Sequence, residues 1–190
     1  SLVGSEMCIR DSYVLGNNSI EEAIMRLKNN GFPAGINAVI FLLHKPVGLG
    51  SEANVLQMNN PLVKQFFDTV DTQKFSFKIG FDSCSIPAVL NLTHNIDHDS
   101  IDTCEGSRWS MYITSDMKAL PCSFDNQELR WAFDISNASI EDAWNSPQFE
   151  SFRSHFRNSC PNCQCQHSCM GGCPIRPQVV LCDKVEKELY

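Results

Sequence analysis

The sequence has no apolar run long enough to cross a membrane. A spanning helix needs about 20 mainly apolar residues in succession, whereas the longest uninterrupted apolar stretch, AVIFLL, covers only 38–43. The N-terminus lacks a basic segment followed by an apolar core, so we expect no secretory signal peptide and a cytoplasmic location. Positive charge is also sparse, with 15 Lys and Arg against 22 Asp and Glu and no basic stripe. These absences argue against a membrane protein and against nucleic acid as the main partner.

The first 12 residues, SLVGSEMCIRDS, do not read as ordinary protein sequence. They resemble the translated adapter sequence found at the ends of proteins predicted from environmental sequencing reads. We therefore expect residues 1–12 to be a sequencing artefact. In that case Cys8 has no function, and the natural sequence that precedes residue 13 is missing.

Between residues 13 and 94, predicted helices alternate with predicted strands. Helical spacing of apolar residues and suitable cap residues predict helices over 18–30, 61–71 and 87–92. Continuous runs of β-branched and aromatic residues predict strands over 36–43 and 74–81. This alternation is typical of βα units, which form a parallel sheet or part of a barrel. Two predicted strands cannot close a barrel, so we expect a piece of a longer one.

From residue 95 onward the pattern changes to shorter and more polar segments. SMYIT (110–114) and KALPC (118–122) flank a turn and predict a β-hairpin. Ser139 followed by acidic residues predicts a helix over 139–144, and Pro147 predicts the start of another over 147–156. The segment after it is rich in Gly and Pro and has little apolar surface to bury. We therefore expect a small irregular α+β domain that something other than a hydrophobic core holds together.

Six of the ten cysteines lie in the stretch CPNCQCQHSCMGGCPIRPQVVLC, which begins at Cys160. Its C-x2-C pair lets two thiolates reach one centre from a single turn of the chain. Gly171 and Gly172 allow the backbone to fold closely around a bulky group. Upstream, Cys104 and Cys122 flank the predicted hairpin and can approach each other across it.

Three kinds of chemistry use cysteines clustered in this way. A disulfide framework requires an oxidising compartment, which nothing in the sequence indicates, and 43% hydrophobic residues suffice for a core without one. A structural zinc site takes four ligands, commonly from two C-x2-C-like pairs, but only one such pair and the nearby His167 are present. Iron–sulfur clusters bind thiolates at irregular spacing, and two cubane clusters need up to eight. Seven are supplied by Cys104, Cys122, Cys160, Cys163, Cys169, Cys173 and Cys182, with Cys84 or Cys165 as an eighth.

This spacing resembles the SPASM domain, the C-terminal extension of many radical S-adenosylmethionine (SAM) enzymes. The family pattern is C-x(9–15)-G-x4-C, then C-x2-C-x5-C-x3-C, then a last cysteine. The sequence matches it except that Met117 stands where the family prefers glycine. IEDAWNSPQFESFR (140–153) also resembles the family's segment before the cysteine run. Upstream, LLHKPVGLG and KIGFDSC resemble the later strands and loops of the radical SAM partial barrel.

The resemblance implies a fold, cofactors and ligands. It assigns residues 13–94 to the C-terminal α/β units of a partial barrel, and residues 95–190 to a SPASM domain with two auxiliary [4Fe–4S] clusters. The first cluster would be bound by Cys104, Cys122 and Cys173, and the second by Cys160, Cys163, Cys169 and Cys182. We consider Cys84 the candidate for the open position on the first cluster, with a water, a substrate atom or Cys165 as alternatives.

The resemblance also implies an activity for a longer parent protein. That activity is radical modification of a peptide or protein, with a flavodoxin or ferredoxin as a candidate electron donor. SAM and a third [4Fe–4S] cluster would bind only in the full-length parent, because the C-x3-C-x2-C motif of the SAM cluster does not occur in this sequence. We therefore expect the chain to be inactive alone. The alternatives are a zinc-binding structural module and a non-catalytic interaction adaptor.

Four further residues have two interpretations each. His44 and Lys45 follow a predicted strand, where barrel enzymes place their chemistry; they either line a SAM or substrate pocket or belong to a structural loop. Asp82 is either a pocket acid near Cys84 or a cap for backbone N–H groups. Asp125 either faces a substrate near the first cluster or is a solvated turn residue.

Overall fold

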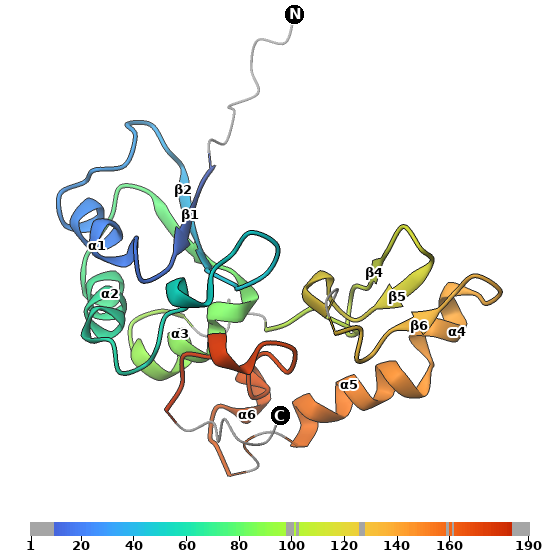
Figure 1. The fold of residues 1–190 in the computed structure, drawn as a ribbon. Coiled ribbons are helices and arrows are strands. Elements are labelled where there is room, and N and C mark those ends of the chain that lie inside the picture. Colours follow the sequence, from blue (N-terminus) through green and yellow to red (C-terminus); the bar gives the residue numbers. More distant parts are fainter. Residues whose placement is uncertain are drawn as a thin grey trace, which may run out of the picture.

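The computed structural model describes residues 10–97, 101, 103–125, 128–158, 160 and 162–183 (Figure 1). They form a small mixed α/β structure with two separate three-stranded sheets. The interpretation of residues 1–12 as an artefact stays a prediction, and residues 1–9, with Cys8, lie outside the described part. In the described ranges we find no helix with the length and apolarity that a membrane span requires.

The first sheet is parallel and has the strand order β1-β2-β3. Its strands are β1 (Arg10–Leu15), β2 (Ala38–Leu43) and β3 (Lys78–Phe81). In the central strand, Ile40 lies opposite Ser12 on one side and Gly80 on the other. The strand predicted over 36–43 is confirmed as β2, and the strand predicted over 74–81 is confirmed for its second half, whereas β1 was not predicted. The described strands do not close a barrel, so the partial barrel stays a proposal.

Three helices cover this sheet, as predicted. They are α1 (Ile20–Lys28), α2 (Pro61–Thr72) and α3 (Ile86–Leu92). Helices α1 and α2 pack against each other on one side of the sheet (Figure 1). Buried aromatic rings form the centre of the core, where Phe41 of β2 meets Phe66 edge-to-face with ring centroids 4.9 Å apart. This core gives β2 and β3 fixed positions and so fixes where their C-terminal ends lie.

The second sheet is antiparallel and lies at one side of the molecule (Figure 1). It contains β4 (Tyr112–Ile113), β5 (Lys118–Leu120) and β6 (Phe133–Asp134), followed by α4 (Ile140–Trp144) and α5 (Pro147–Asn158). The predicted hairpin and both helices are confirmed, and β6 is an addition. Ser139 and Asp142 form a capping box at the start of α4. Helix α5 buries Phe149 and Phe152, and it leads back towards the cysteine run.

The cysteine run packs against the parallel-sheet part of the molecule. Its short helix α6 (Gln166–Cys169) lies against α3 (Figure 1). The end of the run buries Val179, Val180 and Leu181, and Leu181 belongs to the main hydrophobic core. The expectation that this segment has little apolar surface to bury is therefore wrong for its last part, because a short apolar sequence can still insert into a core built by other elements.

Candidate metal centre

Four cysteines from distant parts of the chain lie together between the part of the molecule with the parallel sheet and the part with the antiparallel sheet. They are Cys84 in the 3-10 turn Ser83–Ser85, Cys104 before β4, Cys122 after β5, and Cys173 in the cysteine run. The side chains of Cys84 and Cys173 are hydrogen-bonded to each other. Cys84 is also close enough to interact electrostatically with Cys104 and with Cys122. The structure thus places Cys173 of the run beside the two hairpin cysteines and adds Cys84, which follows strand β3 of the parallel sheet.

A second group of four cysteines consists of Cys169 and three neighbours. Its neighbours in electrostatic contact are Cys182, Cys160 and Cys163. All four line one small pocket, together with Cys165 and with Pro87 and Leu90 of α3. Cys165 therefore lies beside the second group.

The backbone around these sulfur atoms has an unusual conformation. Cys160, Met170, Gly171 and Gly172 all have positive φ angles, of 50°, 57°, 85° and 85°. At Gly172 a Cβ atom would lie 2.8 Å from both γ-carbons of Val180. A side chain does not fit there, so this glycine is required both by its φ angle and by the close approach of Val180.

Backbone N–H groups point at one sulfur atom after another. Gly106 donates to Cys104, Phe124 to Cys122 and Gly171 to Cys169. The N–H of Arg176 donates to the Sγ atom of Cys173 over 3.3 Å. Hydrogen bonds to sulfur are one of the means by which a protein tunes an iron–sulfur cluster. Sequence reasoning missed these donors because a backbone N–H carries no residue-type signal.

Burial raises the pKa of several of these thiols above its ordinary value. It raises the pKa of Cys104 to about 12 and that of Cys169 to about 11, and it also raises the pKa of Cys122. For Cys84, the hydrogen bond with Cys173 and burial both raise the pKa. Because a metal binds the thiolate, loading either group must release protons.

The described cysteines include two groups of four thiols. Among the described residues, no group of three or more His, Cys, Asp or Glu side chains is placed to hold a metal ion. The nine described cysteines are all free thiols. In a [4Fe–4S] cluster each of four thiolates binds a different iron atom, so the ligands surround a volume. Two groups of four thiols suit two such clusters.

A buried ion pair lies beside the first cysteine group. The Nζ atom of Lys45 is 2.6 Å from Oδ2 of Asp82, and their side chains are only 9% and 16% exposed. The other carboxylate oxygen of Asp82 accepts a hydrogen bond from the backbone N–H of Ser85 over 3.1 Å. Asp82 is therefore both a cap and the partner of a buried cation. His44 instead places Nε2 2.9 Å from the carbonyl oxygen of Ser51, within the loop.

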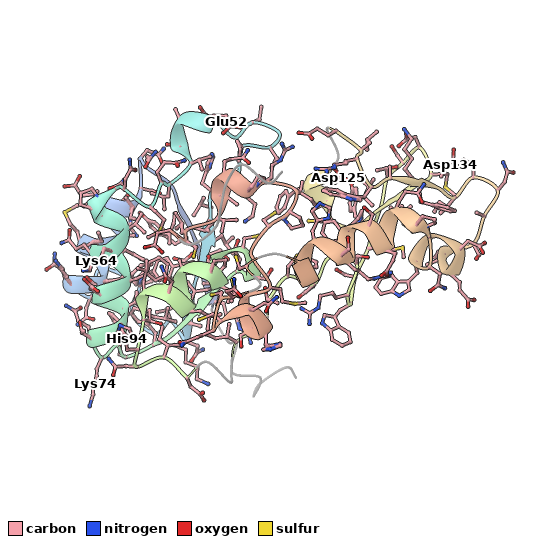
Figure 2. All side chains as sticks on the ribbon, turned by 90° about the horizontal axis from the view of Figure 1, so that it is seen from below. Glu52, Lys64, Lys74, His94, Asp125 and Asp134 are labelled. Atoms are coloured by element: carbon pink, nitrogen blue, oxygen red, sulfur yellow. The ribbon has the colours of Figure 1, made fainter. Side chains whose placement is uncertain are left out.

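Asp125 is buried, which contradicts the interpretation as a solvated turn residue. It is 1% exposed and accepts hydrogen bonds from the backbone N–H groups of Arg130 and Trp131, over 3.3 and 3.2 Å. Burial raises the pKa of Asp125. Figure 2 shows it between the parallel-sheet end of the molecule, where Lys64 lies, and the far end, where Asp134 lies. Asp125 thus fixes the backbone of Arg130 and Trp131, in the segment that follows Cys122.

Met117 occupies a backbone conformation that favours glycine. Its φ angle is 61°, within the turn between β4 and β5. Its carbonyl oxygen accepts a hydrogen bond from the N–H of Ile135 over 2.9 Å, which ties the turn to the segment after β6. The departure from the family pattern at this position leaves the turn intact.

Comparison with known protein families gives one match. Residues 104–170 match the SPASM iron–sulfur cluster-binding domain. No curated protein and no solved structure matches the chain. The matched stretch contains Cys104, Cys122 and the first four cysteines of the run, and it ends before Cys173 and Cys182. It confirms the resemblance of this stretch and indicates iron–sulfur cluster binding, whereas the resemblance to a radical SAM barrel stays a prediction.

Proposed function

We propose that this chain binds two auxiliary [4Fe–4S] clusters as the C-terminal part of a radical SAM enzyme that modifies a peptide or protein. The observation that supports the proposal most strongly is the sorting of eight cysteines into two groups of four. The groups are interleaved along the chain, because Cys173 of the run joins the upstream cysteines while Cys182 joins Cys169. This is the ligand order that the family resemblance implies.

Cys84 completes the first ligand set in this proposal. Its hydrogen bond to Cys173 and its interactions with Cys104 and Cys122 support that role. Cys165 lines the pocket of the second group and so is the weaker candidate. Cys104, Cys122 and Cys173 would provide the other three ligands. Cys160, Cys163, Cys169 and Cys182 would bind the second cluster.

The residues around each group would hold and insulate the clusters. When bound, such clusters supply one-electron transfer. Burial of Cys169, Cys173 and Cys182 keeps water from the ligands, and the N–H groups of Gly106 and Arg176 stabilise negative charge on sulfur. A flavodoxin or ferredoxin is the proposed electron donor. SAM and its own cluster would bind to sequence outside this chain.

Anaerobic reconstitution of the full chain tests the proposal. We expect brown protein with absorbance near 400 nm and about eight iron and eight sulfide ions per chain. Cys173→Ala and Cys169→Ala should each lose about half of the iron, because they belong to different groups. A colourless protein with stoichiometric zinc and no inorganic sulfide would contradict the proposal and support a structural zinc module.

A further inference from the structure

Resting on the proposed function, we infer that Lys45 raises the reduction potential of the first cluster, the one assigned to Cys84, Cys104, Cys122 and Cys173. Lys45 does this through a fixed positive charge, and it is not a ligand. The inference assigns a role to a residue that neither the cysteine pattern nor the family match includes.

The ammonium group of Lys45 is held in place from three directions. It donates to the carbonyl oxygen of Leu43 over 3.0 Å and pairs with Asp82 at 2.6 Å. It also lies 5.1 Å from the centroid of the Phe124 ring, a cation–π contact. Asp82 is two residues before Cys84, and Phe124 is two residues after Cys122. The cation is thereby fixed beside two of the proposed ligands, with its side chain 9% exposed.

The ammonium group of Lys45 acts on three thiols of the first group. Lys45 interacts electrostatically with Cys84, Cys173 and Cys122. The carboxylate of Asp82 is partly occupied by the backbone N–H of Ser85. The fixed positive charge of Lys45 therefore lies beside the first group, while Asp82 is held by Lys45 and Ser85.

The charge of Lys45 would affect the reduction potential of a bound cluster. If a cluster is bound, one electron from an external low-potential reductant would add one unit of negative charge to it and break no bond. A buried cation stabilises that added charge far better than an exposed one, because solvent screens it less. The thiols that interact with Lys45 belong to the first group. We therefore expect Lys45 to act on one cluster selectively.

The test is a redox titration of the reconstituted full chain with dithionite, followed by electron paramagnetic resonance. In Lys45→Met, we expect the equilibrium constant for reduction of one cluster to fall at least about tenfold, a downward shift of ~59 mV for one electron. The midpoint of the other cluster should stay in place. Lys45→Arg keeps the charge and should keep both midpoints.

Asp82→Asn provides a second route to the same answer. The amide retains an oxygen that can accept from Ser85, while the negative charge disappears, so the same midpoint should rise. If Lys45→Met takes up no iron, the midpoint of Asp82→Asn alone tests whether the ion pair sets the potential of the first cluster. Unchanged midpoints in Lys45→Met and Asp82→Asn, or equal shifts of both clusters, would overturn the inference and leave the two-cluster proposal standing. A wild-type chain that binds no cluster would overturn both.

Discussion

The thiols of Cys84 and Cys173 are hydrogen-bonded to each other, although one follows a strand of the parallel sheet and the other lies in the cysteine run. The neighbouring Gly172 packs against Val180, and a Cβ atom there would also lie 3.3 Å from Cγ of Pro87 in α3. The C-terminal end of β3 is therefore the place where the cysteine run meets the sheet. A cluster bound there would join the two parts of the molecule.

Cys84→Ala should lower the iron content of the reconstituted chain, because it removes the proposed fourth ligand of the first cluster. We expect a loss of up to about half of the eight irons of a two-cluster protein. Cys165→Ala is the matched control and should keep the full content, since Cys165 lines the other pocket. Iron and acid-labile sulfide analysis measures both. Equal contents in the two variants would remove Cys84 from the ligand set.

Gly172→Ala should destabilise the protein more than Gly35→Ala. Both glycines have similar positive φ angles, 85° and 81°, so both substitutions carry the strain of an L-residue in that region. Only at position 172 does the new methyl group overlap with Val180, whereas nothing lies within 4 Å at position 35. We expect the difference in the free energy of unfolding to be about 1–3 kcal/mol, measured by urea denaturation. Equal destabilisation would show that Val180 moves aside freely.

Met117→Gly should stabilise the hairpin turn. Relief of the left-handed strain at φ 61° favours the variant by about 1–2 kcal/mol, and the greater chain entropy of glycine opposes it by about 0.5–1 kcal/mol. The side chain of Met117 is half exposed, so little packing is lost. Met117→Ala keeps the Cβ atom and should bring no such gain. A lower urea midpoint for the glycine variant than for the alanine variant would refute this reasoning.

Asp125→Ala should destabilise the protein by about 1–3 kcal/mol, because it leaves the buried N–H of Trp131 without its acceptor. Asp134→Ala serves as the control. Asp134 accepts from the N–H of Ser136 at an exposed site, where water can replace it, so little change is expected. Thermal or urea unfolding of the two variants compares the sites, both of which are labelled in Figure 2. A larger effect at position 134 would contradict the assignment.

The metal-free, reduced protein should lose stability at alkaline pH through Cys104. Its pKa is about 12 in the folded chain against an ordinary value of 9.0, so above pH 9 the unfolded chain releases the proton while the folded chain keeps it. Stability therefore falls as pH rises from about 9 to about 12. Between pH 9 and 10 the loss from this group is about 1 kcal/mol. Cys104→Ala should lack this part of the decline in urea denaturation, and parallel curves for the two proteins would contradict it.

The sequence by itself determined the secondary structure of most elements and the chemistry of the tail. Helices α1, α2 and α5 follow from apolar spacing, cap residues and prolines, which act within a few positions along the chain. The cysteine spacing likewise carries the SPASM resemblance, which the match over residues 104–170 confirms. These features can be predicted from the sequence because their causes lie within a few residues along the chain.

Only the tertiary structure decided which distant residues meet. The strand β1 forms because Ala38–Leu43 offers a partner along its whole length, and Leu181 is buried because the core of the parallel sheet has room for it. The contact of Cys84 with Cys173, the burial of Asp125 and the placement of Lys45 depend in the same way on packing between the two parts. Such contacts join residues far apart in sequence, and no local propensity encodes them.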